Sequence, residues 1–146
     1  MRDGGNLVSQ IHQLSGRVFT RILRDFGLDE INPSQGRILY ALWKEDGLSQ
    51  GELAERTKLD KSTLTSMLDR LEKAGQIERI CDGADSRKKI VRTTEVNRRM
   101  HDRYEKASGK MIAVYYRGHS EAEVDAFEDM LRSVLSNLEE ELAGRP

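Results

Sequence analysis

The segment from Asp60 to Gly75 groups side chains that could contact nucleic acid. Read at helical spacing, its polar face consists of Ser62, Thr63, Ser66, Arg70 and Lys73. Its apolar face consists of Leu64, Met67, Leu68 and Leu71. Short hydroxyl side chains let a helix N-terminus approach phosphates and base edges, and cations can pair with phosphates. Because Ser and Thr are also common near helix starts, this segment alone leaves capping as an alternative.

Catalytic and metal-binding chemistry are not indicated. The histidines, His12, His101 and His119, include no pair at a metal-ligand spacing such as i, i+4. The sequence has no G-x-S-x-G motif, no glycine-rich phosphate loop and no Cys/His cluster. We therefore expect a protein that is not an enzyme and that needs no cofactor and no metal. For Cys81, in a predicted strand, a packing role is the first interpretation and redox sensing the alternative.

Two capping patterns place the polar face on the second of two short helices. Ser49 and Glu52 have the spacing of a capping box, which opens a helix that ends near residues 56–57. Asp60 is placed to cap the next helix, and Gly75 is placed to end it. Two short helices joined by a tight turn are typical of a helix-turn-helix.

Two strand-like runs follow, separated by a basic turn. Residues 77–81 and 89–94 alternate between apolar and polar side chains. Residues 82–88 between them hold turn formers together with Arg87 and Lys88. A helix-turn-helix followed by a basic hairpin is a winged helix. The predicted fold class is therefore mainly α, with a small β-hairpin wing.

The charge distribution singles out the same region. The 146-residue chain has a net charge of −1, so its total charge says nothing about nucleic acid. Residues 56–99 nevertheless hold 12 Lys/Arg and 7 Asp/Glu, whereas residues 1–55 and 100–146 carry −2 and −4. A basic middle between acidic ends is expected if only the middle approaches phosphates.

Composition and length fit one intracellular domain. A single cysteine excludes a disulfide framework within the chain and suits a reducing compartment. No apolar run approaches the roughly 20 residues that span a membrane, and the first residues are not followed by a signal-peptide core. We expect a cytoplasmic protein with no membrane contact.

Long helices with apolar stripes are predicted on both sides of the winged helix. They cover residues 7–26, 94–117 and 120–142, with Thr94 and Ser120 as N-caps. Such stripes either cover the chain's own core or interlock with a second copy. We favour a homodimer because the stripes are long.

A further helix begins at Pro33, capped by Asn32 and Gln35, and is expected to close at Gly47. Gly36, in its interior, indicates either close packing or an open pocket.

The winged-helix segment resembles the MarR (multiple-antibiotic-resistance regulator) family of transcription factors. The residues that carry the resemblance are 48–56, 60–65, 68–72 and the wing motif 85–87. In that family an Asp-x-Arg wing places its Arg in the minor groove, oriented by the Asp. Here these residues are Arg87 and Asp85. Asn97 stands where the family usually has Gly, so the helix start there is expected to differ.

The resemblance implies a sequence-specific double-stranded DNA-binding transcriptional repressor that acts as a homodimer on a palindromic operator. It implies one MarR-type domain, 1–146, with a DNA-binding lobe at 32–94 and dimerisation helices at 5–27 and 95–143. The implied DNA interface consists of Ser49, Lys61, Ser62, Thr63, Thr65, Ser66, Arg70, Lys73, Asp85, Arg87, Lys88 and Lys89. The alternative is a winged-helix protein-interaction module, which the hydroxyl-rich face and cationic wing disfavour.

The resemblance also implies a cleft for a small aromatic or phenolic anionic effector. Its candidate lining residues are His12, Arg17, Arg37, Tyr40, Trp43 and Tyr104. Each has a plainer alternative: Tyr40 and Trp43 can fill the core, and Arg17 can pair with a nearby acid.

Overall fold

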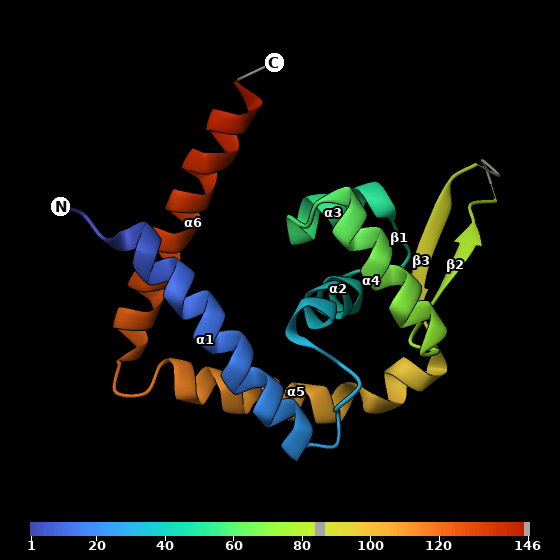
Figure 1. Cartoon of the computed structure of the whole chain (residues 1–146), viewed down its shortest axis with the longest axis horizontal. Helices are drawn as coiled ribbons and strands as arrows, with labels where there is room; N and C mark the ends of the chain where they lie inside the picture. The colour runs from blue at the N-terminus through green and yellow to red at the C-terminus, as the bar shows by residue number, and fades with distance from the viewer. Residues whose placement is uncertain (84–86, 145–146) are drawn as a thin grey trace. The chain divides into compact units, whose positions relative to one another are not determined.

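The computed structural model describes residues 1–83 and 87–144 as helices with one small sheet (Figure 1). In chain order the elements are α1 (Gly4–Asp25), α2 (Pro33–Lys44), β1 (Leu48–Ser49), α3 (Gln50–Thr57), α4 (Lys61–Lys73), β2 (Ile77–Cys81), β3 (Lys89–Thr93), α5 (Glu95–Tyr115) and α6 (Glu121–Ala143). The chain divides into two compact units, residues 1–111 and 112–146. The predicted fold class, mainly α with a small β wing, is confirmed.

The wing sheet has three antiparallel strands in the order β1-β3-β2. β2 and β3 form the predicted hairpin, with Arg79 opposite Val91 and Cys81 opposite Lys89. The two-residue strand β1, in which Leu48 lies opposite Val91, was not predicted. Two residues are too short a run to show alternation, yet they join the helix-turn-helix directly to the wing.

Side-chain caps start α2, α3, α4 and α6 where the sequence predicts them. Asn32, Ser49 and Ser120 each accept a hydrogen bond from the backbone N–H three residues later, and the side chain at that position bonds back. Asp60 accepts from the Thr63 N–H at 2.8 Å. These bonds satisfy backbone donors that have no partner inside the helix, and so they fix where each helix begins.

Glycines in the left-handed region end α1 and α4. Gly27 and Gly75 have φ angles of 71° and 75°. In both cases the following N–H bonds to the carbonyl five residues back, at 2.8 and 2.9 Å. The expectation that Gly47 closes α2 is wrong. That helix ends at Lys44, because Glu45 already has an extended backbone, and Gly47 serves the connection to β1.

A single apolar core fills the unit of residues 1–111. In the helix-turn-helix, Leu53, Leu64, Leu68 and Leu71 are at most 1% exposed. Ile38, Leu39 and Leu42 of α2 pack into the same core. Burying a leucine or isoleucine side chain contributes about 1.5–3 kcal/mol, so this cluster holds the short helices in place.

Gly36 marks close packing, which settles one of the questions that the sequence leaves open. A Cβ at this position would stand 2.1 Å from the Tyr104 hydroxyl oxygen and 3.1 Å from its Cζ. Tyr104 reaches α2 from α5 and is only 5% exposed. The absent side chain therefore lets α5 press an aromatic ring against α2.

A buried polar link also joins α2 to α5. Asn97 is fully buried, accepts from the Trp43 Nε1–H at 2.7 Å and donates to Gln76 Oε1 at 2.9 Å. Its backbone N–H donates to the Thr94 hydroxyl at 3.3 Å, which starts α5 as predicted. The Asn97 side chain therefore satisfies polar groups of Trp43 and Gln76 inside the core.

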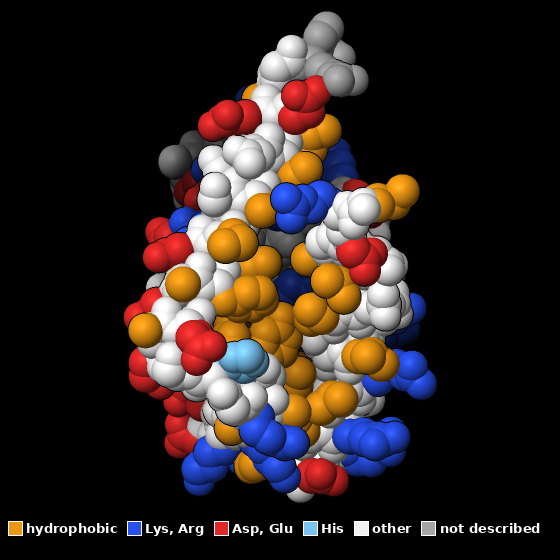
Figure 2. Space-filling view, turned by 90° about the vertical axis from the view of Figure 1, so that its left-hand side faces the viewer, with side chains coloured by type: hydrophobic (Ala, Val, Ile, Leu, Met, Phe, Trp, Pro, Cys, Tyr) orange, Lys and Arg blue, Asp and Glu red, His pale blue; other side chains and the backbone are white. Residues whose placement is uncertain are grey.

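The unit of residues 112–146 is dominated by α6, none of whose described residues is buried. Its exposed apolar side chains include Phe127, Leu131, Val134, Leu135 and Leu138. In the first unit, the start of α1 likewise exposes Leu7, Val8, Ile11 and Leu14. Hydrophobic side chains are visible at the surface in Figure 2. Within the described residues, no helix is both long and apolar enough to cross a membrane.

Candidate nucleic-acid interface

The second helix of the helix-turn-helix, α4, is fixed to the wing by one arginine. Arg79 of β2 donates to Asp69 Oδ1 at 2.6 Å and to Glu72 Oε1 at 2.9 Å, and its backbone N–H bonds to Glu72 Oε2 at 3.2 Å. The Arg79 side chain is only 17% exposed. These bonds hold the pKa of Glu72 below its ordinary value, chiefly through the Arg79 side chain. The alternating strand pattern did not reveal this link, because it spans two elements.

The face of α4 opposite the leucines is exposed, as the sequence predicts. Ser62, Ser66, Arg70 and Lys73 are exposed, and Thr63 is half-buried. Among the described residues, neither Arg70 nor Lys73 pairs with an acid, so both cations are available to phosphates. Of the two flanking candidates, Lys61 is exposed and Thr65 is half-buried.

Three of the α4 hydroxyls bond within the helix. Ser62 Oγ donates to Asp60 Oδ1 at 2.8 Å, and Thr63 Oγ1 donates to Asp60 Oδ2 at 2.9 Å. Thr65 Oγ1 donates to the Lys61 carbonyl oxygen at 2.9 Å. The sequence pointed to Asp60 only as a backbone cap, so its bonds to the hydroxyls were missed.

Ser49, another predicted contact, starts α3 and is half-buried. Its hydroxyl accepts from the Glu52 N–H at 3.2 Å, and the Glu52 carboxylate accepts from the Ser49 N–H at 3.2 Å. These bonds lower the pKa of Glu52, with the backbone bond to Ser49 as the largest cause. The capping role of Ser49 is confirmed, and its contact with DNA stays a prediction.

The wing presents cations between β2 and β3 and at the first residue of β3. Arg87, Lys88 and Lys89 are all exposed. Asp85 lies outside the described residues, so its orientation of Arg87 stays a prediction. Cys81, at the end of β2, is exposed, and its interpretation as a packing residue is therefore wrong.

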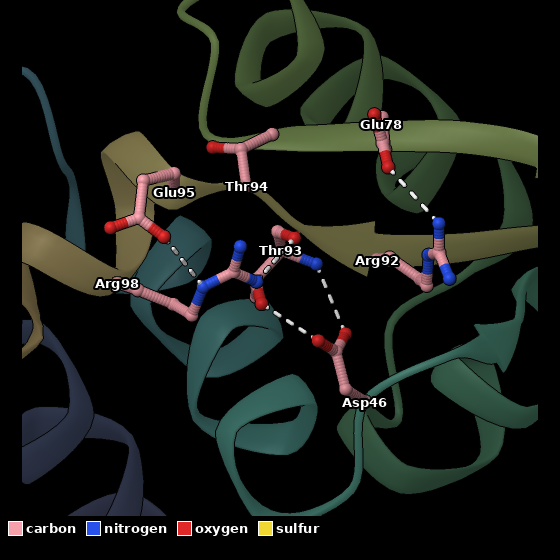
Figure 3. A pocket seen from close by; sticks show the side chains of 7 residues that line it. All are labelled: Asp46, Glu78, Arg92, Thr93, Thr94, Glu95 and Arg98. Carbon is pink, nitrogen blue, oxygen red and sulfur yellow. Dashed lines mark hydrogen bonds and ion pairs between the residues drawn. The ribbon is translucent and has the colours of Figure 1, made fainter.

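A polar cavity of about 420 Å³ lies at the base of the wing (Figure 3). Asp46 there accepts from the Thr93 N–H at 3.0 Å and from the Thr93 hydroxyl at 2.8 Å. Arg92 pairs with Glu78 at 3.4 Å, and Arg98 donates to Glu95 at 3.3 Å. Arg98 also donates to the Thr93 carbonyl oxygen at 3.2 Å, so the cluster ties β3 to the start of α5. Because both arginines already have acidic partners, we assign no anion to this cavity.

The structure brings together two of the six effector candidates. The rings of Trp43 and Tyr104 have centroids 4.8 Å apart, and Phe19 packs against Tyr104 at 5.8 Å. Burial raises the pKa of Tyr104 to about 12, so the phenol stays protonated at neutral pH. Among the described residues, its hydroxyl makes no hydrogen bond.

The other four candidates lie at the surface. His12, Arg17 and Arg37 are exposed, and none of them forms an ion pair with a described residue. Tyr40 is 56% exposed, with the Lys44 ammonium 4.8 Å from its ring centre, so the view that it fills the core is wrong. A cavity of about 490 Å³ does open beside α5, but it is lined by other residues, including Leu28, Arg99 and Arg103.

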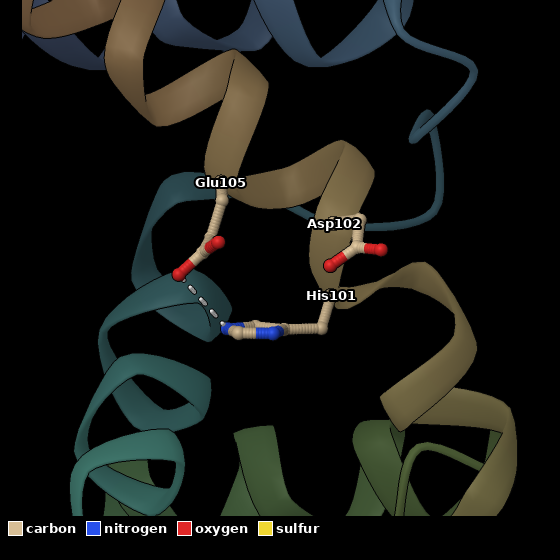
Figure 4. A group of neighbouring side chains, drawn as sticks. All are labelled: His101, Asp102 and Glu105. Carbon is tan, nitrogen blue, oxygen red and sulfur yellow. Dashed lines mark ion pairs between the residues drawn. The ribbon is translucent and has the colours of Figure 1, made fainter.

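Three possible metal donors lie together on α5 (Figure 4). Ligand atoms of His101, Asp102 and Glu105 lie within 4.8 Å of one another. The His101 ring packs on Trp43 at 4.5 Å, and its Nε2 lies 3.5 Å from Glu105. The group holds one histidine and two carboxylates, so it has no histidine pair that would signal it in the sequence. A packed ring and an i, i+4 pair explain the arrangement, so we assign no metal to it.

Comparison with known proteins agrees with this geometry. A model described as MarR family matches residues 31–89, the segment that holds the helix-turn-helix and most of the wing. The predicted resemblance of this segment to the MarR family is thereby confirmed, and the structural likeness below extends over most of the chain.

Individual relatives are similar over different lengths. HTH-type transcriptional regulator TtmR of Methylorubrum extorquens (strain PA1) is 36% identical over 83 residues, which is 57% of this chain and 41% of TtmR. The match therefore spans about two fifths of that relative's length.

Two solved structures are similar over most of the chain. PcaV of Streptomyces coelicolor, in complex with its natural ligand, has a TM-score of 0.78 and 27% identity, covering 90% of this chain and 91% of PcaV. A mutant MarR from E. coli, complexed with operator DNA, has a TM-score of 0.80 and 25% identity, covering 90% and 92%.

Proposed function

We propose that this protein is a sequence-specific double-stranded DNA-binding transcription regulator that works in the cytoplasm. The observation that carries the proposal is α4. Its leucines are buried, its cations and the side chains of Ser62 and Ser66 are exposed, and Arg79 links it to a basic wing. Such a helix fits the major groove, while Arg87 reaches the minor groove and Lys88 and Lys89 contact phosphates.

The same protein acts as a homodimer on a palindromic operator. The support is the exposed apolar face of α6, since a helix with no buried residue needs a partner for that face. Two recognition helices related by two-fold symmetry reach half-sites about one helical turn apart. The proposed effect of occupying the operator is repression.

The direct test is binding of a labelled DNA fragment from the protein's own promoter region, measured at two salt concentrations. Arg87→Ala should weaken specific binding about 10- to 100-fold, because a base-reading arginine is lost. Lys89→Ala should weaken all sequences alike and lower the salt slope by about one. Unchanged affinity for Arg87→Ala would refute the minor-groove role, and equal binding of unrelated DNA would favour the protein-interaction alternative.

We further propose a small aromatic or phenolic anion as effector, bound beside Tyr104 and Trp43. The support is a protonated, buried phenol that makes no hydrogen bond to the described residues and lies among aromatic rings. Such an O–H donates to a carboxylate or phenolate, and aromatic walls bury a ring.

The effector regulates only if it binds the DNA-bound and unbound dimer differently. Calorimetric titration of salicylate, with and without operator DNA, measures that difference. We expect tighter binding without DNA, and equal affinities would exclude a regulatory role. Tyr104→Phe, which keeps the ring and removes the donor, should weaken binding about tenfold.

A further inference from the structure

Helix α4 contains four hydroxyl side chains, and they differ in where their protons point. The hydroxyls of Ser62 and Thr63 lie 2.8 and 2.9 Å from the two carboxylate oxygens of Asp60. Thr65 donates to a backbone carbonyl of its own helix. Ser66, by contrast, makes no hydrogen bond to any described residue.

Asp60 determines the direction of these bonds. Its pKa is lowered, first by the backbone N–H of Thr63 and then by the hydroxyls of Ser62 and Thr63. The carboxylate is therefore ionised at neutral pH, and an ionised carboxylate only accepts hydrogen bonds. Each hydroxyl has a single proton, which it donates in a hydrogen bond to Asp60. Only its oxygen lone pairs remain for a hydrogen bond with DNA.

We propose that Ser62 and Thr63 read the operator as hydrogen-bond acceptors only, and that Asp60 is the positioning residue that imposes this. The inference rests on the proposed function, because it assumes that α4 lies in the major groove. There, adenine N6 and cytosine N4 are donors, whereas guanine offers N7 and O6, and thymine offers O4, as acceptors. The positions contacted by Ser62 and Thr63 are therefore occupied by adenine or cytosine.

Guanine and thymine are disfavoured at these positions. A guanine or thymine edge would bring two acceptors together with no proton between them, or it would pull the hydroxyl away from Asp60. Either outcome leaves a desolvated acceptor unpaired, which is the costly state of a hydrogen-bonding group. Phosphate oxygens are also acceptors, so the same restriction prevents these hydroxyls from donating to the DNA backbone. Donor groups on base edges remain as their partners. The Ser66 hydroxyl can still either donate or accept a hydrogen bond.

Asp60→Asn tests the direction of the side-chain hydrogen bonds without removing the helix cap. Asparagine is as good an N-cap as aspartate, so its Oδ1 still accepts from the Thr63 N–H and α4 stays folded. Its Nδ2 is a donor, so the hydroxyl facing that group accepts from it and turns its own proton outward. The variant should then prefer guanine or thymine at that position, with roughly a tenfold change in base preference.

The experiment is selection of binding sites from random DNA by the full-length parent and its variants. The parent should enrich adenine or cytosine at the positions contacted by Ser62 and Thr63. Asp60→Asn should replace this with guanine or thymine only at the position contacted by Thr63, because Thr63 Oγ1 faces Oδ2 whereas Ser62 still donates to Oδ1. Ser62→Ala removes the hydroxyl and should lose the preference at its position without gaining a new one. Circular dichroism confirms that each variant keeps its helices.

A matched variant controls for charge. Glu55→Gln neutralises an exposed carboxylate of α3 that is bonded to Lys58 at 2.8 Å, not to a hydroxyl. It should change affinity for all sequences alike and leave the selected motif unchanged. An Asp60→Asn motif identical to the parent's would overturn the inference alone. Enrichment of no motif by the parent would overturn the proposed function and this inference with it.

Discussion

Helices α4 and α6 have similar apolar stripes, but the stripe is buried in α4 and exposed in α6. In α4, Leu64, Leu68 and Leu71 are at most 1% exposed. In α6, Leu131, Leu135 and Leu138 are 37%, 46% and 59% exposed. Both helices begin with a side-chain cap, so the difference does not come from how well each helix forms.

The difference lies in what completes each helix. The chain itself covers the apolar face of α4, which leaves the polar face with its hydroxyls and cations for a partner. In α6 the apolar face is not covered within the chain and remains exposed, so a partner that covers this face has to be apolar too. Helical periodicity alone gives the same pattern for both, and only the burial of each face tells them apart.

The sharpest way to break this comparison is to charge the apolar face of α6. The double variant Leu135→Asp and Leu138→Asp should raise the dimer dissociation constant at least about 100-fold, because two leucines per chain are lost and like charges are buried. Sedimentation velocity measures the shift from dimer to monomer. Operator affinity should fall with it, since a monomer reaches only one half-site.

Ser133→Asp is the matched control, because it adds a charge to α6 at an exposed position outside the apolar stripe. It should leave the dimer intact. A double leucine variant that still sediments as a dimer would show that α6 is not the interface. The stripe would then need another explanation.

Much of the winged helix could be predicted because its signals are local. The capping box of Ser49 and Glu52, the Asp60 cap and the Gly75 stop each lie within a few residues, and all three are confirmed. Local bonds of this kind depend on backbone geometry that a few neighbouring residues determine.

The missed features depend on residues that belong to different helices and strands. Arg79 bonds to α4 from the wing, Asn97 bonds to Trp43 from 54 residues away, and β1 needs β3 to be a strand at all. The charge or polarity of these side chains is plain in the sequence, but their partners are chosen by the tertiary fold. The outcome for Gly36 was open for the same reason, since Tyr104 comes from another helix.

A smaller effect is expected from filling the space at Gly36. Gly36→Ala should lower the free energy of unfolding by up to about 2 kcal/mol, because overpacking costs about 1–3 kcal/mol and the gain in helix propensity offsets about 1 kcal/mol of this. Urea denaturation measures the change. Adding Tyr104→Phe removes the atom 2.1 Å from the new methyl group and should recover part of the loss.

Gly109→Ala is the control for helix propensity. Gly109 lies in α5, the helix that carries Tyr104, and a Cβ there would meet nothing within 4 Å. This substitution should be neutral or stabilising by up to about 1 kcal/mol. If Gly36→Ala behaved in the same way, the contact between α2 and α5 would have to be loose.

A still smaller effect should come from removing the arginine that links α4 to the wing. Arg79→Met should cost about 1 kcal/mol, because it breaks a network with Asp69 and Glu72 whose carboxylates are largely exposed. Arg92→Met removes a single exposed pair with Glu78 at 3.4 Å from the neighbouring strand. It should cost less than half as much.

The pH dependence distinguishes the Arg79 network from simple packing. Because the pKa of Glu72 is lowered in the folded state, its stabilisation is fully present above the ordinary carboxyl value of 4.5. That stabilisation is lost as pH falls through the lowered pKa. The stability difference between the parent and Arg79→Met should therefore shrink in acid, as urea denaturation at neutral pH and below pH 4.5 would measure. A difference that stays constant over this range would mean that Arg79 holds α4 through its apolar stem and not through the carboxylates, and the recognition helix would then be fixed by packing alone.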